Sequence, residues 1–261
     1  MPRASRQIRF RHAIQRETSR VLGPLWTLPA VFAMRFGFGY RIERLRELRA
    51  EYRRIRNESS APLLICANHL TLIDSFLVAW ALASFWRYSL DWSALPWNTP
   101  ERENFAANWR SRVLVYLAKC IPISRGGTRE ETAEMIARVS HLLSRGETAL
   151  IFPEGGRSRS GRIGPDEAAW GVGRIVAAVP GCRVLCVYLR GQSQTGFSAQ
   201  PRKGERFDVR LACIEPKTDL RGARSWRDLV RQIVSQLARM EDEYFAEQGR
   251  TAIGSSCDGG Q

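Results

Sequence analysis

Short runs of consecutive apolar residues alternate along the chain with longer segments of helical periodicity. Three runs, LLICA at residues 63–67, TALIF at 148–152 and RVLCVYL at 183–189, have the length and unbroken apolarity of buried strands. A fourth segment, RFDVRLAC at residues 206–213, alternates apolar with charged residues, as a strand with one solvated face does. Buried strands separated by helices form parallel sheets covered by helices, so we predict a single α/β domain with a mostly parallel mixed sheet flanked by helices.

Helical periodicity fills the intervals between these strands. The apolar segment at residues 71–86 is one helix candidate, and residues 128–146 are another. In the second segment Thr128 and Glu131 form a capping-box pattern, and Gly146 is suited to end the helix. Both helices lie between the strands predicted at residues 63–67 and 148–152.

Two further helices are predicted in the C-terminal half. Residues 168–179 form a short helix with glycines, and residues 226–245 form a long one with Ser225 and Asp228 as its expected cap. The apolar stripe of the long helix consists of Leu229, Ile233, Leu237, Met240 and Tyr244. This stripe predicts a helix that lies on the sheet.

The first part of the chain is strongly basic. The whole chain carries a formal charge of +14, and residues 1–60 contribute fourteen arginines against five glutamates. A basic segment of this kind binds a polyanion, either an anionic membrane surface or a nucleic acid. No recognised nucleic-acid-binding module accompanies it, so no nucleic-acid partner is expected.

An uncharged apolar run lies inside this basic segment. Residues 21–34 contain no charge, but they are too few to span a bilayer, which needs about 20 apolar residues. Pro24 and Pro29 interrupt the run, and no cleavage site typical of a secretory signal follows it. Apolar and aromatic residues flanked by arginines are typical of a segment that lies in the membrane interface.

A cationic amphipathic segment follows at residues 41–56. Ile42, Leu45, Leu48 and Tyr52 fall at helical spacings, and arginines occupy much of the remainder. An ordinary amphipathic helix packed on the domain would show the same pattern. We expect a peripheral protein on the cytoplasmic face of the cytoplasmic membrane, with an anionic membrane surface as partner.

These observations divide the chain into three parts. Residues 1–57 form the basic interfacial segment, residues 58–248 form the α/β domain, and residues 249–261 are expected to be disordered.

Cysteine and histidine usage indicates neither a disulfide nor a metal site. The six cysteines contain no CxxC pair and mostly stand in apolar company, as small core residues do in a reducing compartment. The three histidines, His12, His69 and His141, are widely separated, and no metal-ligand spacing occurs. His141 falls on the polar side of its helix, where we expect a solvated side chain.

A histidine and an aspartate stand five positions apart in CANHLTLIDS at residues 66–75. Within one helix that separation places them about 140° apart around the axis, so they could not meet. They can meet if His69 lies at a strand end, with Thr71 as N-cap and Asp74 in the first helical turn. The carboxylate would then hold Nδ1 and leave Nε2 as a base for a hydroxyl. The alternative is that Asp74 only completes a T-x-x-D capping box with Thr71.

A second candidate feature is IFPEGGRSRSG at residues 151–161. Glu154 is followed by Gly155 and Gly156, which let backbone N–H groups approach an anion, and then by Arg157 and Ser158. Guanidinium groups bind phosphate in a bidentate way. The sequence is not a Walker loop, and a surface turn with solvated arginines is the alternative. Arg125, in PISRGG at another predicted strand end, is a further candidate cation for the same pocket.

Taken together, these motifs resemble those of the PlsC-like glycerolipid acyltransferases, which include the 1-acylglycerol-3-phosphate acyltransferases. The N-H-x-x-x-x-D motif of that family is matched by Asn68, His69 and Asp74. Its arginine motif is matched by IPISR with Arg125. The F-P-E-G-x-R-S motif is matched by Phe152, Pro153, Glu154, Gly155, Arg157 and Ser158.

The resemblance implies transfer of a fatty-acyl group to a hydroxyl of a lysophospholipid-type acceptor. The donor would be acyl-CoA or acyl-carrier protein, which is a co-substrate, and no cofactor is implied. By resemblance His69 is the general base and Asp74 orients it. The substrate-binding residues implied by resemblance are Asn68, Arg125, Glu154, Gly155, Gly156, Arg157 and Ser158.

Two departures from the family pattern leave the acceptor open. Cys186 stands where the fourth motif usually has a proline, and Trp170 stands where many relatives have a lysine. A non-glycerol acceptor, such as an aminolipid, a glycolipid or a pigment, is therefore an alternative. A third reading is a non-catalytic basic module that binds membranes or nucleic acid, which the intact His69 and Asp74 disfavour.

Overall fold

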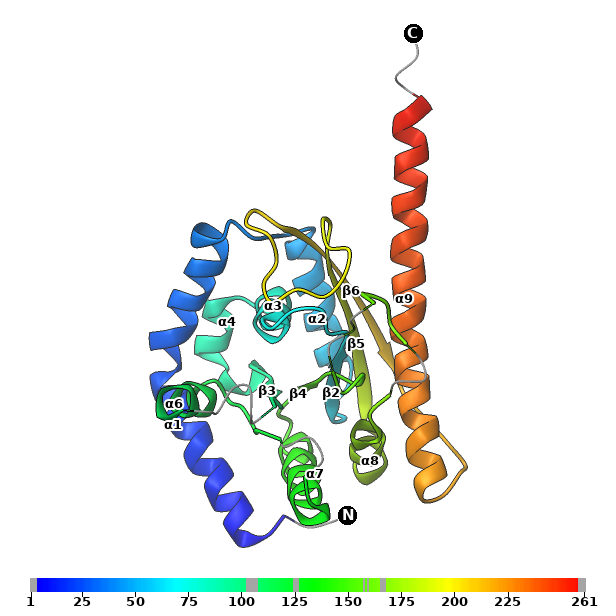
Figure 1. The fold of residues 1–261 in the computed structure, drawn as a ribbon. Coiled ribbons are helices and arrows are strands. Elements are labelled where there is room, and N and C mark those ends of the chain that lie inside the picture. The colour runs from blue at the N-terminus through cyan, green and yellow to red at the C-terminus, as the bar shows by residue number, and fades with distance from the viewer. Residues whose placement is uncertain are drawn as a thin grey trace.

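The computed structural model describes residues 4–101, 108–123, 127–156, 158, 160–164 and 168–257, with side chains as far as residue 249. The strands in these residues are β1 (Arg41–Ile42), β2 (Leu63–Ala67), β3 (Trp97–Asn98), β4 (Ala149–Ile151), β5 (Arg183–Gly191) and β6 (Arg206–Ile214). They form one sheet in the order β1-β6-β5-β2-β4-β3 (Figure 1). Strands β5 and β6 pair antiparallel and the other neighbours pair parallel, which confirms the mostly parallel mixed sheet.

Helices cover both faces of the sheet. The α-helices are α1 (Arg6–Phe32), α2 (Leu45–Glu58), α3 (Asp74–Leu82), α4 (Phe85–Leu90), α6 (Trp109–Leu117), α7 (Arg129–Ser144), α8 (Trp170–Ala178) and α9 (Ala223–Cys257). A π-helical turn, η1 (Ala33–Gly37), and a 3-10 turn, η2 (Trp92–Ala94), complete the helical elements of the described residues. In Figure 1, α9 extends well beyond the sheet at its C-terminal end.

Alternation along the central strands creates two cores. Val184, Cys186 and Tyr188 of β5 pack with α7, α8 and α9 on one face. Leu185 and Val187 point to the opposite face, where α2 and α3 cover them. Side chains that alternate between two buried faces explain the continuous apolar runs from which the strands were predicted.

The predicted helix at residues 71–86 is divided in two. α3 ends at Leu82, because Ala83 is extended, and α4 begins at Phe85. Ser84 caps α4 by accepting a hydrogen bond from Arg87 N at 3.2 Å. A serine that satisfies an otherwise unpaired N–H favours a new helix start over continuation, which apolar periodicity alone does not reveal.

The predicted helical stripe at residues 41–56 is correct only from Leu45 onward. Ile42 lies in β1, which pairs with β6 at Phe207, and Arg44 adopts the left-handed conformation with φ of 47° before α2 begins. The buried residues of α2 are Leu48, Tyr52 and Ile55. The structure therefore packs α2 and β1, both from the basic N-terminal segment, into the same fold as the rest of the sheet.

The C-terminal helix is longer than predicted at both ends. It begins at Ala223, and the hydroxyl of Ser225 donates to Gly222 O rather than capping the helix at residue 226. It continues to Cys257, past residue 249 where a disordered tail was expected. A nucleated helix extends at small cost while no proline intervenes, which accounts for this continuation. The predicted stripe from Leu229 to Tyr244 is buried, as expected.

Helix α1 is continuous and places polar side chains toward the domain. It passes through Pro24 and Pro29, both exposed, so the prolines do not interrupt the helix as the sequence suggested. Its buried residues are His12, Gln15, Ser19, Gly23 and Thr27. No helix in the described part of the chain is both long and apolar enough to cross a membrane.

Buried hydrogen bonds hold α1 in place. Ser19 Oγ donates to Leu117 O at 2.7 Å, and His12 Nε2 lies 2.9 Å from Glu147 Oε1. Burial raises the pKa of Glu147, but the hydrogen bond with His12 and the charge of Lys119 outweigh burial and leave it at about 2. The ring of His141 contacts that of His12 edge-on, so His141 is half-buried rather than solvated as predicted. A polar inner face leaves the apolar side of α1 outside.

Candidate active site

His69 and Asp74 meet at the carboxyl end of β2. Nδ1 of His69 lies 3.0 Å from Oδ2 of Asp74. The same carboxylate oxygen accepts hydrogen bonds from Leu70 N at 2.6 Å and Thr71 N at 2.7 Å. His69 lies outside helix α3 and Asp74 is its first residue, which is the geometry that the five-residue spacing requires.

Thr71 differs from its predicted place. The N-cap of α3 is Ile73, whereas Thr71 was expected to be the cap. The hydroxyl of Thr71 donates to Oδ1 of Asp74 and accepts from Ile73 N at 3.3 Å. Because several donors of the loop bind the carboxylate of Asp74, the loop folds around it. The N-cap of α3 is therefore Ile73, two residues later than predicted.

The backbone of His69 is fixed from both sides by the loop after β4. His69 N donates to Glu154 Oε1 at 3.1 Å, and Ser158 N donates to His69 O at 3.0 Å. The ring of Phe152 stacks on the imidazole, with the centroids 4.0 Å apart and the planes at 15°. The two sequence motifs are therefore joined through one residue, and the side chain of His69 is still 19% exposed.

The turn that carries Glu154 depends on the glycine that follows it. Gly155 has φ of +66°, a conformation that favours glycine, and a Cβ there would lie 2.9 Å from the Cβ of Ala169. Gly155 N donates to Phe152 O at 3.1 Å, and Ala169 N donates to Pro153 O at 2.7 Å. The tight turn brings the buried carboxylate of Glu154 to the backbone of His69, so Glu154 positions the histidine.

Asn68, predicted to bind substrate, is occupied by the sheet. Its Nδ2 donates to Leu189 O at 3.0 Å, and its Oδ1 accepts from Leu189 N at 2.7 Å. The side chain is buried and continues the pairing of β2 with β5 beyond the last residue of β2. Asn68 therefore joins β2 to β5, and its predicted contact with substrate stays a prediction.

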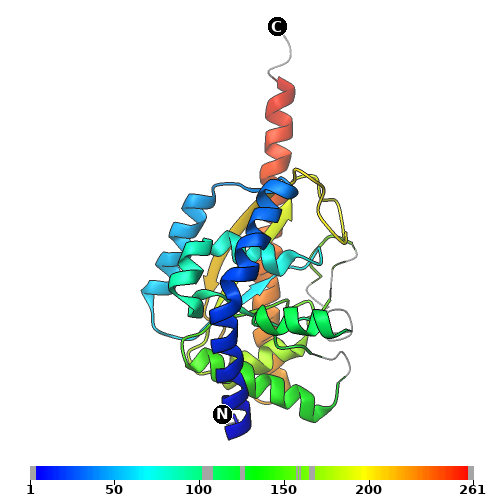
Figure 2. The same cartoon turned by 90° about the vertical axis from the view of Figure 1, so that its left-hand side faces the viewer.

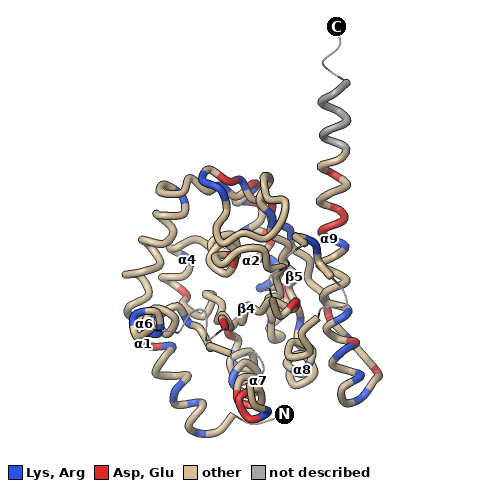
Figure 3. Tube along the Cα trace, in the orientation of Figure 1, with Lys and Arg blue, Asp and Glu red and all other residues tan. Residues whose placement is uncertain are grey.

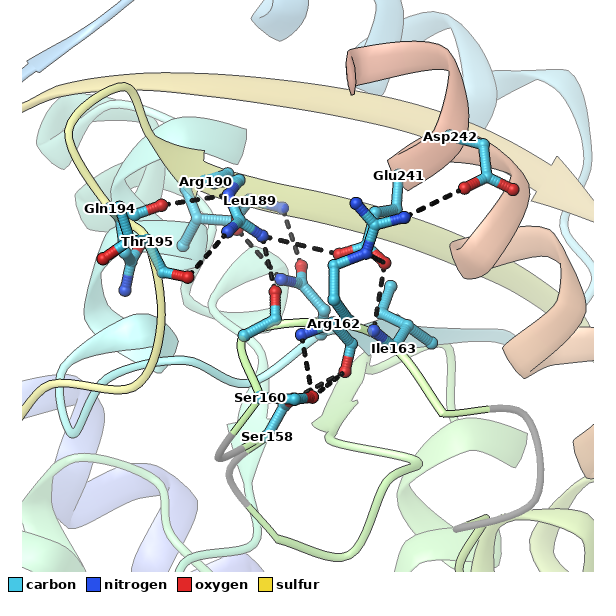
Figure 4. A network of polar contacts seen from close by, with 12 residues as sticks. Ser158, Ser160, Arg162, Ile163, Leu189, Arg190, Gln194, Thr195, Glu241 and Asp242 are labelled. Carbon is cyan, nitrogen blue, oxygen red and sulfur yellow. Dashed lines mark hydrogen bonds and ion pairs between the residues drawn. The ribbon is translucent and has the colours of Figure 1, made fainter. Parts of the chain in front are cut away.

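Ser158, also predicted to bind substrate, takes part in a hydrogen-bond network within the protein. Its hydroxyl donates to Arg162 O at 2.5 Å and lies 3.1 Å from Ser160 Oγ. Figure 4 shows these groups at one end of a polar network that continues to β5 and α9. Ser158 is buried and holds the shape of the loop after Glu154.

Arg190 and Glu241 form the centre of that network. Arg190 Nη1 donates to Gly161 O at 2.7 Å and lies 3.4 Å from Oε1 of Glu241 (Figure 4). Glu241 Oε2 accepts from Ile163 N at 3.0 Å and pairs with Arg162 at 3.2 Å. Both side chains of the central pair are 4% exposed, so this contact is a buried ion pair that ties α9 to the loop.

Arg190 and Glu241 were not among the predicted site residues, although the sequence carries a signal for each. Arg190 directly follows a buried apolar run, and Glu241 is four residues after Leu237 on the buried stripe of α9. A charged residue at a core position has to be paired. No spacing rule connects the two, because they are brought together only by the packing of α9 on β5.

The two arginines expected to bind phosphate are not part of the described structure. Arg125 and Arg157 lie outside the described residues, whereas Gly156 lies within the same turn as Gly155. Ile123 is the last described residue before Arg125, and it forms a parallel bridge with Glu101 at the edge of the sheet. The predicted role of Arg125 and Arg157 in binding phosphate therefore stays a prediction.

Comparison with known proteins identifies the family. A family model described as Acyltransferase matches residues 43–190, which include both motifs around His69. The chain belongs to the PlsC-type acyltransferase family. No curated protein sequence matches the chain. Family membership supports acyltransferase activity, in keeping with a place in lipid metabolism. Strand β6 and helix α9 follow the matched region. Glu241, which pairs with Arg190, therefore lies outside that region.

Replacing Glu241 with glutamine is expected to lower the free energy of unfolding by about 3 kcal/mol, because it leaves Arg190 buried without a counter-charge. The matched control is Asp242→Asn, since Asp242 is 74% exposed and pairs with the same Arg162. That control should change stability by about 1 kcal/mol or less. Urea unfolding measures both, and equal losses in the two variants would contradict the assigned role of Glu241.

Proposed function

We propose that this chain transfers an acyl group from acyl-CoA or acyl-carrier protein to a hydroxyl of a lysophospholipid of the 1-acylglycerol-3-phosphate type. The observation that carries the proposal is the 3.0 Å contact between His69 Nδ1 and Asp74 Oδ2 at the carboxyl end of β2. When Nδ1 of a neutral imidazole carries the proton and is held by a carboxylate, Nε2 is left as a base. No hydrogen bond engages Nε2 among the described residues.

The reaction that follows is direct transfer. Nε2 of His69 removes the proton of the acceptor hydroxyl as its oxygen attacks the thioester carbonyl carbon. The tetrahedral intermediate then collapses, the carbon–sulfur bond breaks, and the departing thiolate takes the proton from the imidazolium. Asp74 stabilises the imidazolium between these steps, while Glu154 and Ser158 keep the ring in place through its backbone.

The acceptor's phosphate is proposed to bind beside the turn that follows β4. Arg125 and Arg157 would supply guanidinium groups, and Gly155 and Gly156 would let backbone N–H groups approach the anion. The backbone contacts of His69 with Glu154 and Ser158 support this assignment, since they join that turn to the proposed base.

His69→Ala should lower kcat by about a thousandfold, which is within the range for loss of a general base. Asp74→Asn should lower kcat by about a hundredfold or more, because it removes the charge that stabilises the imidazolium. Purified protein is given labelled acyl-CoA or acyl-carrier protein with a panel of lysophospholipids, aminolipids and glycolipids, and mass spectrometry identifies the product.

The control variant is His141→Ala, which removes a half-buried histidine on α7 and should keep full activity. Acylation of none of the acceptors by the unchanged protein would contradict the proposed reaction. Full activity of His69→Ala would contradict the proposed base. Acylation of an aminolipid or glycolipid alone would keep the mechanism and replace the acceptor.

We further propose that the outer side of α1 binds the cytoplasmic membrane peripherally, from its cytoplasmic face. α1 contacts α4 and α6, and Figure 2 shows α6 next to α1 and lying across its axis. The apolar face that these helices expose comprises Phe10, Ile14, Val21, Leu22, Leu25, Leu28, Phe32, Phe36, Trp86, Leu90, Trp109, Val113 and Leu114. Basic residues occur along α1 and on α6 beside it (Figure 3). Exposed apolar area of this extent flanked by cations favours an anionic lipid surface.

Leu25→Glu should weaken binding to vesicles containing phosphatidylglycerol about tenfold or more, because burial of one leucine contributes about 1.5–3 kcal/mol. Leu25 is 74% exposed, so the fold should tolerate the change. Leu220→Glu is the control, since Leu220 is 50% exposed and lies outside the apolar face. Sedimentation with vesicles measures binding, and equal retention of both variants would reject this face.

A further inference from the structure

A cavity of about 880 Å³ lies between α1, α6 and α7. None of its lining residues belongs to the site around His69. Three arginines line it, Arg11 from α1, Arg112 from α6 and Arg138 from α7, and no acidic residue is present among the described residues of its wall. The volume is that of a typical small-molecule site, and the charged side chains in the described part of its wall are all basic.

Arg138 is the most deeply placed of the three. Its Nη2 donates to Oε1 of Gln15, and its guanidinium lies over the ring of Trp97 at 5.4 Å. Its Nε is buried and has no hydrogen-bond partner, and no ion pair joins it to a carboxylate of the described residues. Burial lowers the pKa of Arg138 despite the opposing charge of Glu134. Arg138 is partly buried, lines the cavity and makes no ion pair with a described carboxylate, so this guanidinium is suited to an anion from outside the chain.

Gln15 explains why Arg138 is aimed into the cavity. Gln15 is buried, and its Nε2 donates to Tyr116 O at 2.9 Å and to Cys120 O at 3.0 Å. These two bonds fix the amide, so its oxygen is presented to Arg138. The guanidinium is thus held by α1 and the end of α6 before any ligand arrives, which lowers the entropic cost of binding.

Arg11 and Arg112 stand at the rim. Both are exposed, and neither has an ion-pair partner in the part of the chain that the structure describes. Guanidinium groups converging from separate helices are suited to the several oxygens of a phosphate ester.

Apolar side chains make up much of the remaining wall, which also includes Gln7 and Gln15. Phe10 and Ile14 of α1 line the cavity and also belong to the exposed apolar face, and Val115 and Pro122 line it from the other side. The cavity is therefore continuous with the surface proposed to contact the membrane. We propose that it binds the phosphate of an anionic membrane phospholipid, with the lipid chains extending along Phe10 and Ile14.

The membrane is the favoured source of this phosphate ester because the cavity opens beside the apolar face. The phosphates of CoA have similar chemistry but no acyl chains next to the phosphodiester, so the apolar wall would be left unused. The inference rests on the proposed membrane contact for the source of the lipid, and it does not depend on acyl transfer.

The test measures binding of dihexanoyl phosphatidylglycerol to the full chain below the critical micelle concentration, by calorimetry and by the increase in Tm. This lipid is a diacyl phosphodiester with no membrane present, so binding is separated from docking on a bilayer. The variant Arg11→Gln/Arg112→Gln should weaken binding about tenfold or more, because charge-assisted hydrogen bonds are lost. The matched control Arg20→Gln/Arg110→Gln removes the same charge from the same helices outside the cavity, and it should bind like the unchanged protein.

Further probes make the outcome specific. His69→Ala should bind the lipid unchanged, which separates this site from the one around His69, whatever the outcome of the activity assays. Dihexanoyl phosphatidylcholine and inorganic phosphate should bind more weakly than the anionic lipid. The proposal is overturned by equal losses in the two double variants, by inorganic phosphate binding as tightly as the lipid, or by no lipid binding at all. Binding of CoA that is lost in Arg11→Gln/Arg112→Gln, with no lipid binding, would assign the cavity to the acyl donor instead.

Discussion

The carboxylate of Asp74 is the interaction on which the site depends. It accepts hydrogen bonds from two consecutive backbone N–H groups and from the hydroxyl of Thr71, and its Oδ2 lies 3.0 Å from Nδ1 of His69. These bonds close the loop between β2 and α3, so the same group that begins the helix also fixes the orientation of the histidine. The capping role and the orienting role, alternatives in the sequence, are combined in one side chain.

Contacts of His69 with the turn after β4 hold this loop in place against the rest of the protein. The turn after β4 holds both backbone groups of His69, and the network through Arg190 and Glu241 holds that turn against α9. The family match ends at Arg190, so a helix outside the matched region completes the support of the site. This arrangement couples the geometry at the edge of the sheet to the packing of α9.

Local patterns predicted most of the fold and the contact between His69 and Asp74. The strands β2, β4, β5 and β6, the capping box at Thr128 and the stripe of α9 follow from apolar periodicity and cap residues, which act within a few positions. Long-range contacts could not be predicted in this way. Ile42 pairs with β6, and the amide of Asn68 bonds to β5, partners more than a hundred residues away.

The orientation of helix α1 also could not be predicted from local patterns. Its composition predicted contact with lipid, but its polar residues His12, Gln15 and Ser19 face the domain, and periodicity does not reveal which face is covered. The three arginines of the cavity come from helices far apart in sequence, so only their packing brings them together.

The central claim is that Asp74 holds the neutral imidazole of His69 with its proton on Nδ1, which leaves Nε2 free as the base. Nitrogen-15 NMR of histidine-labelled protein measures this directly, with His69→Ala assigning the signal among the three histidines. Neutral His69 is expected to be protonated at Nδ1 and unprotonated at Nε2. A neutral His69 with its proton on Nε2 would contradict the central claim.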